Sequence, residues 1–173
     1  MRWVLFIIGL VLFSAPLEEP DLPYPCFFNE HDRWLLHSYK DNQLDSLSTK
    51  PKEYQKFFEV IIQFDYDEHI EAGTFEGQSL SNLIYGKYDL LENNEMKVTQ
   101  FEHSQMSEPS WGVDNLETAM KSLNSFYCNN DTLFLNYNKG AHTLVFLKTE
   151  IAFYDWDLYF KGQKTGKEIL GNN

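Results

Sequence analysis

Gly73-Thr-Phe-Glu-Gly-Gln-Ser-Leu-Ser-Asn-Leu-Ile-Tyr-Gly-Lys-Tyr88 is the stretch of sequence that decides the fold. It contains Gly73, Gly77 and Gly86, and glycine adopts backbone angles that other residues resist. A sharp bend of the chain is therefore expected here. Asn82 is a further candidate for left-handed geometry, because its short amide tolerates that region and can bond its own backbone. The stretch predicts a feature of the fold and names no activity.

Segments rich in β-branched and aromatic residues lie on both sides of this stretch, and they predict strands. The predicted strands are residues 33–39, 58–64, 70–75, 86–91, 96–101, 132–137 and 142–148. The last two flank Asn138-Lys139-Gly140, where Gly140 is expected to supply the turn angle. Residues 41–51 are polar and predict a loop, residues 65–68 predict a turn, and 151–160 is a further strand candidate.

One helix is expected, from about Asp114 to Tyr127. Asp114 is placed to cap it, with Glu117 three residues later as in a capping box. A single buried face follows the helical period: Leu116, Met120, Leu123 and Tyr127. The predicted fold class is α+β and mostly β: a small antiparallel curved sheet or partly open β-barrel with one packed helix (about 114–127).

Composition indicates one globular domain of an acidic protein. The chain has 173 residues, is 43% hydrophobic and 16% aromatic, and carries a formal charge of -12 from 26 acidic and 14 basic residues. Such a surface repels phosphate backbones and anionic lipids, so nucleic acid is excluded as a partner.

The N-terminus predicts export. A cationic start and a short apolar run make residues 1–15 a signal peptide or N-terminal anchor. Residues 16–26 then form a proline-rich linker, 27–148 the domain and 149–173 a C-terminal extension. The expected location is the periplasm, the cell envelope or the exterior, with membrane contact only through an uncleaved leader.

Cys26 and Cys128 are the two cysteines of the chain. In an oxidising compartment such a pair is a disulfide candidate, which would fasten the N-terminal segment to the end of the domain. The alternative is two buried free thiols, each acting as a small hydrophobic residue.

A search for chemistry gives no catalytic residue, cofactor or metal site. Nucleophile and phosphate-loop motifs are missing from the sequence. Asp65, Asp67 and Glu71 lack the glycine and the spacing of a calcium loop. Glu102 and His103 are strand neighbours and point to opposite faces. Paired acids for glycoside hydrolysis stay open, because such pairs come from distant positions.

Most aromatic residues are expected in the core. The exceptions are Tyr154 and Trp156, which mix with acids in Phe153-Tyr-Asp-Trp-Asp157 and suit a surface that faces a partner.

The order of motifs resembles the META-domain (HslJ-like) family over about residues 32–148. The resemblance rests on Trp34 at the first strand, on Gly77, Asn82, Gly86 and Tyr88 of the central stretch, and on Ser104-Gln-Met106 before the helix. Leu80-Ser81 stands where the family has Gly-Cys, and Glu108 stands where it has a later cysteine, so no role of that cysteine pair is carried over. The resemblance implies a small β-barrel-like envelope domain without established catalytic residues.

The expected function is therefore that of an exported, non-catalytic, envelope-associated META-like domain that binds a protein partner or ligand, with a link to stress. The alternative is a lipocalin-like carrier of a small apolar molecule, in which the interior would be a continuous apolar cavity rather than a filled core. A hydrolase is the third hypothesis, and it requires titratable groups that converge in one cleft.

Overall fold

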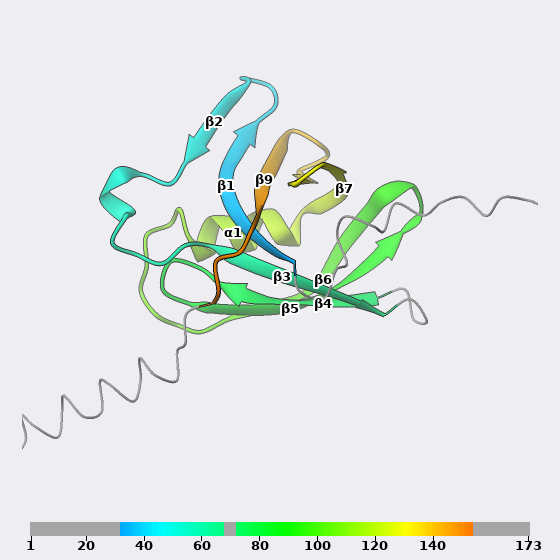
Figure 1. Ribbon diagram of the computed structural model, residues 1–173. Helices are drawn as coiled ribbons and strands as arrows, with labels where there is room; N and C mark the ends of the chain where they lie inside the picture. Colours follow the sequence, from blue (N-terminus) through cyan, green and yellow to red (C-terminus); the bar gives the residue numbers. More distant parts are fainter. Residues whose placement is uncertain (1–31, 68–71, 154–173) are drawn as a thin grey trace, which may run out of the picture.

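A computed structural model describes residues 32–67 and 72–153 of the chain. These residues form nine antiparallel strands and one α-helix (Figure 1). The elements are β1 (Arg33–Asp41), β2 (Ser46–Thr49), β3 (Ile61–Asp67), β4 (Ala72–Gln78), β5 (Leu83–Leu91), β6 (Glu95–His103), α1 (Val113–Lys121), β7 (Leu123–Asn129), β8 (Thr132–Tyr137) and β9 (His142–Thr149). Short 3-10 turns occupy Lys52–Tyr54 and Glu92–Asn94.

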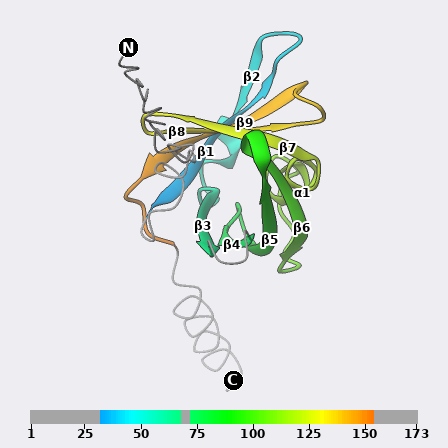
Figure 2. The same ribbon diagram turned by 90° about the vertical axis from the view of Figure 1, so that its right-hand side faces the viewer.

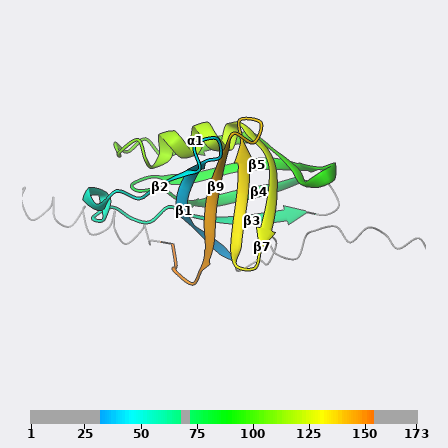
Figure 3. The ribbon, with the colours of Figure 1, turned by 90° about the horizontal axis from the view of Figure 1, so that it is seen from above.

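The sheet curls until its ends meet. Strands β3 to β9 pair in chain order, and β1 closes the ring by pairing with β3 at residues 33–35 and with β9 along 33–41. Strand β2 continues the β3 edge of β1 through residues 38–41 and projects from the ring as part of a hairpin (Figure 2). Seen from above, β1, β9 and β7 cross over β3, β4 and β5 (Figure 3).

Helix α1 covers the weakest join of the ring. Strands β6 and β7 share one residue pair, Glu95 with Ser125, and α1 lies beside both strands (Figure 2). The helix buries one face in the core, made of Val113, Leu116, Ala119 and Met120. Burial of that apolar face, rather than strand pairing, holds this side of the molecule together.

The predicted fold class is confirmed, but the expected extent of the helix is wrong. α1 ends at Lys121, and Leu123–Asn129 is strand β7. Leu123 is buried whether it extends a helix or begins a strand, so its position in the apolar pattern could not separate the two. Pairing of β7 with β8 decides the outcome, and it leaves Tyr127 47% exposed instead of buried on a helix.

The expected cap is also replaced. The residue preceding the helix is Gly112, and no side chain of that position caps it. The Glu108 carboxylate accepts the Val113 backbone N–H instead, and Glu117 forms an ion pair with Lys121 and lies 3.6 Å from His103 Nε2. The carboxylate of Glu108, which lies outside the helix, therefore caps the helix N-terminus in place of Asp114.

Three further boundaries differ from expectation. Strand β2 lies inside the predicted loop 41–51, and β3 runs through Asp67 into the predicted turn. Of the strand candidate 151–160, residues 151–153 are not in a strand and the rest lies outside the described residues. The Gly140 turn is confirmed, with φ of +80°.

The glycines of the central stretch do not bend the chain. Gly73, Gly77 and Gly86 lie inside β4 and β5, and none has positive φ. Instead, a Cβ at Gly77 would overlap the carbonyl oxygen of Ile61 on the neighbouring strand, and one at Gly86 would overlap the Phe75 ring. These positions need glycine because backbone and rings approach them closely.

Candidate functional site

The residues of the predicted structural motif lie in the core. Trp34 and Tyr88 are fully buried, and the Tyr88 ring crosses the space left by Gly73 to donate a hydrogen bond to the Asp65 carbonyl at 2.9 Å. Burial, followed by the nearby Asp65 charge, raises the pKa of the Tyr88 hydroxyl. Trp34, Tyr88 and the glycines therefore shape the curved sheet and offer no group to a ligand.

Asn82 is buried, and its φ is not left-handed, contrary to expectation. Its side chain does not bond its own backbone. The amide oxygen accepts hydrogen bonds from the Met106 N–H at 2.7 Å and the Ser104 hydroxyl at 3.1 Å. The amide nitrogen donates to the Met106 carbonyl and to Glu108 Oε2, both at 2.9 Å. Asn82 thus holds the segment before α1 as a neighbouring strand would.

Glu108 completes this buried polar cluster, which we call the Asn82–Glu108 lock. Besides Asn82, its Oε2 accepts the Ser79 hydroxyl at 2.8 Å and the Ser81 N–H at 2.6 Å, and its Oε1 accepts the Val113 N–H. The lock ties the β4–β5 turn to the start of α1. Both carboxylate oxygens are engaged in these bonds, which indicates a structural role.

The other candidate residues fall partly outside the described residues. Cys128 on β7 is disulfide-bonded, while Cys26 lies outside the described range, so the Cys26–Cys128 pairing stays a prediction. Tyr154 and Trp156 also lie outside it, and the partner surface proposed for them stays untested.

The histidines make no metal site in the described residues. His103 Nε2 lies 3.6 Å from Glu117 of α1, while Glu102 on the opposite face accepts hydrogen bonds from Gln100 and Tyr85. The expectation that Glu102 and His103 occupy different faces is confirmed. Within 32–67 and 72–153, no three His, Cys, Asp or Glu side chains gather as metal ligands. Glu71 lies outside this range.

A small hollow of about 190 Å³ lies where the β1–β2 hairpin meets β8 and β9. His142 stacks on Tyr137 with ring centroids 5.2 Å apart, and its Nδ1 is 3.9 Å from Asp41 Oδ2. The Leu44 N–H, above all, lowers the pKa of the Asp41 carboxyl, whose Oδ1 accepts it at 3.0 Å. Asp41 is thereby committed to the hairpin turn, and the cluster lacks a free nucleophile.

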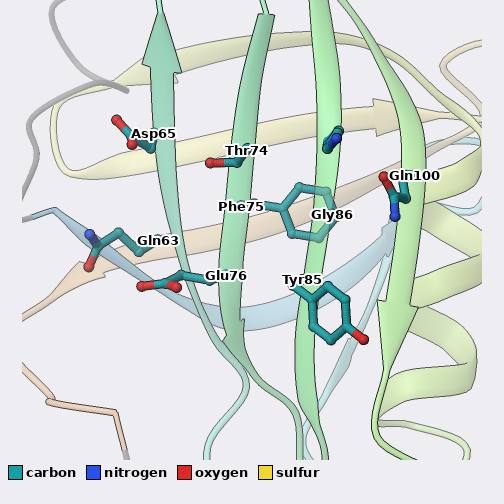
Figure 4. Close-up of a pocket in the computed structure, with 9 residues that line it drawn as sticks. Gln63, Asp65, Thr74, Phe75, Glu76, Tyr85, Gly86 and Gln100 are labelled. Atoms are coloured by element: carbon teal, nitrogen blue, oxygen red, sulfur yellow. The ribbon is translucent and has the colours of Figure 1, made fainter.

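A larger hollow, of about 360 Å³, lies on the outer face of β3 to β6, and we call it the Tyr85 trough. Its floor is the backbone around Phe75 and Gly86, whose neighbours on each strand point outward. Figure 4 shows the two walls, each formed by a row of side chains across the strands. One wall is Gln63, Glu76 and Tyr85, and the other is Asp65, Thr74, Lys87 and Gln100.

A second hollow of about 390 Å³ adjoins the Tyr85 trough. The two hollows share Asp65, Thr74 and Lys87 as a common wall, and Asp67 and Asp89 border the second. Together they form a continuous strip along the strands of the outer sheet face, lined largely by polar side chains.

Tyr85 lies on this face, whereas the sequence favoured the core for most of the aromatic residues. It is 49% exposed, and its hydroxyl is hydrogen-bonded to Glu102, which also accepts the Gln100 amide at 2.5 Å. The bond to Glu102 raises the pKa of the Tyr85 hydroxyl. An exposed ring whose hydroxyl is already bonded is held in a fixed orientation, which lowers the entropy lost when a ligand binds to it. The outward position of Tyr85 beside the inward Gly86 could have indicated it from the strand period.

Among the described residues, no helix is long and apolar enough to cross a membrane.

Comparison with known proteins gives little. No family model matches the chain, and no curated protein matches it. Among solved structures, the chain is similar to the crystal structure of a DUF4847 family protein from Bacteroides vulgatus ATCC 8482. The match covers 71% of this chain and 96% of that chain, at 12% identity and a TM-score of 0.47. A similarity of that level carries no argument about function.

Proposed function

We propose that the protein is an exported, non-catalytic, META-like binding domain of the cell envelope, and that the outer face of β3 to β6 is its binding surface. The observation that carries the proposal is Tyr85, an exposed aromatic ring fixed by Glu102 at the edge of a polar hollow. Aromatic residues with a polar tip are favoured where a surface meets a partner.

The packing of the interior supports this function over that of a carrier. A carrier needs an apolar cavity inside the ring of strands. Here large side chains from opposite sides of the ring meet in one cluster, with Trp34, Phe64 and Tyr88 among those that are almost or fully buried. The Phe64 ring lies 5.9 Å from Tyr88 and 6.1 Å from Phe75.

The openness of the Tyr85 trough supports binding over hydrolysis. Asp65 and Glu76 stand on opposite walls, as a pair of glycosidase acids would. Both are exposed strand residues, whereas such enzymes separate the roles of two acids by burying one of them. The trough therefore lacks the difference in burial between two acids that such enzymes use.

The two positions where the META family has cysteines are in contact here. Ser81 and Glu108 occupy them, and the Ser81 N–H donates to Glu108 at 2.6 Å. This contact joins the β4–β5 turn to the segment before α1.

Site-specific photo-crosslinking tests the proposal. The photoreactive analogue p-benzoylphenylalanine replaces Tyr85 in one variant and Tyr127 in a matched control, since the two tyrosines are 49% and 47% exposed on different parts of the sheet. Each variant is expressed in its native host with its leader, irradiated, and analysed by intact mass. Adducts at position 85 and not at 127 are expected. Adducts at 127 alone, or at neither position, contradict the proposed surface.

The same spectra test the alternatives. Mass that leaves the unmodified protein on mild denaturation indicates a carried ligand and contradicts a filled core. The mass also reports whether residues 1–15 are removed on export, and retention of the protein in the cytoplasm contradicts the proposed location.

A further inference from the structure

The chemistry of the outer sheet face points to a class of ligand, an inference that rests on the proposed function. The side chains that border the Tyr85 trough carry amides, hydroxyls, carboxylates and one ammonium group. Phe75, which also borders the trough, is 2% exposed, and its ring packs on Phe64 and Phe101. A lipid or another apolar ligand would therefore meet polar side chains on both walls and, apart from the Tyr85 ring, no exposed apolar side chain.

The charged side chains of the strip distinguish between anionic, cationic and uncharged polar ligands. Asp65, Glu76 and the neighbouring acids disfavour a polyanion. Lys87 disfavours a polycation, because it lies on the wall common to both hollows, so a chain of cations that crosses the strip must pass its ammonium group. What the strip can accommodate is an uncharged ligand with many polar groups.

The arrangement of donors and acceptors specifies those polar groups further. Gln63 and Gln100 each carry a donor and an acceptor, Asp65 and Glu76 accept, and Lys87 donates. A hydroxyl group donates and accepts at once, so it is satisfied by such mixed neighbours. A ligand rich in hydroxyl groups can therefore enter without leaving its own or the protein's polar groups unpaired.

Tyr85 supplies the apolar part of the recognition. Its hydroxyl is bonded to Glu102, which leaves the face of the ring as the surface offered to a ligand. A pyranose ring presents C–H groups on one face and hydroxyls at its rim, which matches a flat aromatic ring bordered by Glu76 and Gln100.

We propose that the strip formed by the two hollows binds a neutral glycan, with one sugar ring stacked on Tyr85 and the chain running along the strands toward Asp67 and Asp89. The volumes of about 360 and 390 Å³ each lie within the range of small-molecule sites. Two adjoining hollows predict that an oligosaccharide binds more tightly than a single sugar.

Titration of the isotope-labelled full chain with neutral oligosaccharides tests the inference by NMR. The probes are cellotetraose, maltotetraose and chitotetraose, with glucose and N-acetylglucosamine as single sugars. At least one tetrasaccharide is expected to shift amide signals of β4 and β5 with a dissociation constant on the order of 1 mM or lower. Its affinity should exceed that of its single sugar about tenfold.

Variants decide whether binding uses Tyr85. Tyr85→Ala should weaken the tetrasaccharide at least tenfold, and Tyr85→Phe, which keeps the ring and loses the Glu102 bond, only a few-fold. Tyr127→Ala is the matched control and should leave binding unchanged. Equal affinity of Tyr85→Ala and the unaltered chain overturns the inference. So does the failure of all three tetrasaccharides to bind at about 10 mM, and so does tighter binding of oligolysine.

The failure of this inference is distinct from that of the proposed function. If photo-crosslinking at position 85 captures a protein while no oligosaccharide binds, the proposed binding surface is supported and the glycan ligand is refuted. If neither experiment gives a signal at Tyr85, both proposals are refuted.

Discussion

Replacing Asn82 by aspartate tests the Asn82–Glu108 lock at its centre. The change removes one nitrogen that donates to Met106 O and to Glu108 Oε2, both at 2.9 Å, and puts an oxygen in its place. The bond that Asn82 Oδ1 accepts from the Met106 N–H is kept. The substitution therefore isolates the donor function of Asn82 with almost no change of shape.

The expected cost follows from the groups left without a partner. The Met106 carbonyl loses a hydrogen bond worth about 0.5–1.5 kcal/mol, and the Glu108 carboxylate loses one worth about 1.5–3 kcal/mol because it is charged. Two carboxylates then face each other at a distance where both cannot readily be ionised. The free energy of unfolding at pH 7 should fall by about 3–5 kcal/mol, because these losses add to the repulsion between the two carboxylates. Asn82→Ala, which adds no charge, should cost about 2–3 kcal/mol.

Acid distinguishes the two variants. In Asn82→Asp, a proton shared by the two carboxylates restores a donor, so the folded state binds a proton more tightly than the unfolded chain does. The pKa of the pair is raised on folding, so its stabilising contribution is complete below about pH 4 and is lost as pH rises through the folded value. The free energy of unfolding of Asn82→Asp should therefore rise relative to that of Asn82→Ala as pH falls from about 7 to 4.

Urea unfolding followed by tryptophan fluorescence measures these changes, since Trp34 and Trp111 are buried. Glu108→Gln in the Asn82→Asp background removes the repulsion and supplies an amide donor, so the double variant should recover about 2 kcal/mol of coupling energy. A cost below about 1 kcal/mol for Asn82→Asp, or the same pH dependence as Asn82→Ala, would refute the reasoning.

Three further predictions concern other parts of the fold. Gly77→Ala should lower the free energy of unfolding by more than about 3 kcal/mol in urea titrations, because the added Cβ meets the backbone of β3. The control is Gly140→Ala, which should cost only about 1 kcal/mol because Gly140 has open space around it and a φ of +80°. Equal costs of the two substitutions would contradict the close approach at Gly77. Burial raises the pKa of the Tyr39 hydroxyl, so the fold should lose stability as pH rises above about 10, where an unfolded tyrosine ionises. The Tyr39→Phe variant should lose less stability over the same range. Thermal unfolding of both proteins between about pH 8 and 11 measures the difference. If Cys26 and Cys128 are bridged, reduction should lower the free energy of unfolding by about 4 kcal/mol for a loop of roughly 100 residues. Alkylation should then modify both cysteines of the reduced chain and neither cysteine of the oxidised chain, and the stability of the Cys26→Ser, Cys128→Ser double variant should not change with the reductant.

The fold class could be predicted because the apolar pattern and the turn residues agreed. The hairpin around Gly140 is the clearest case, with a positive φ that glycine adopts without strain. In the predicted strand 96–101, the apolar alternation of Met96 and Val98 slips at Gln100, and the structure gives the physical cause. Strand β6 carries an extra residue opposite Lys87 and Tyr88, so its pattern shifts face at that bulge.

The candidate site could not be predicted, because it depends on pairing across strands. Tyr85 and Glu102 are neighbours only once β5 and β6 take their register, and Gln63 joins them through β4. Glu108 is a similar case, since its partners lie 5 to 29 positions away in the chain. The sequence marks such residues as polar and does not say which strand will lie beside them.

The closure of the ring by β1 and β9 has a consequence for how the chain folds. Every residue pair of that ladder is at least 101 positions apart, whereas the other ladders join strands that are close in sequence. Such non-local pairing is slow, because a long loop must close before any contact is gained. During synthesis β1 emerges before the other strands, and the edge that pairs with β9 stays without its partner strand until residue 149 is made. Trp34 and Leu36 stay without their final neighbours throughout that interval. The nascent chain therefore remains open until its last strand is available.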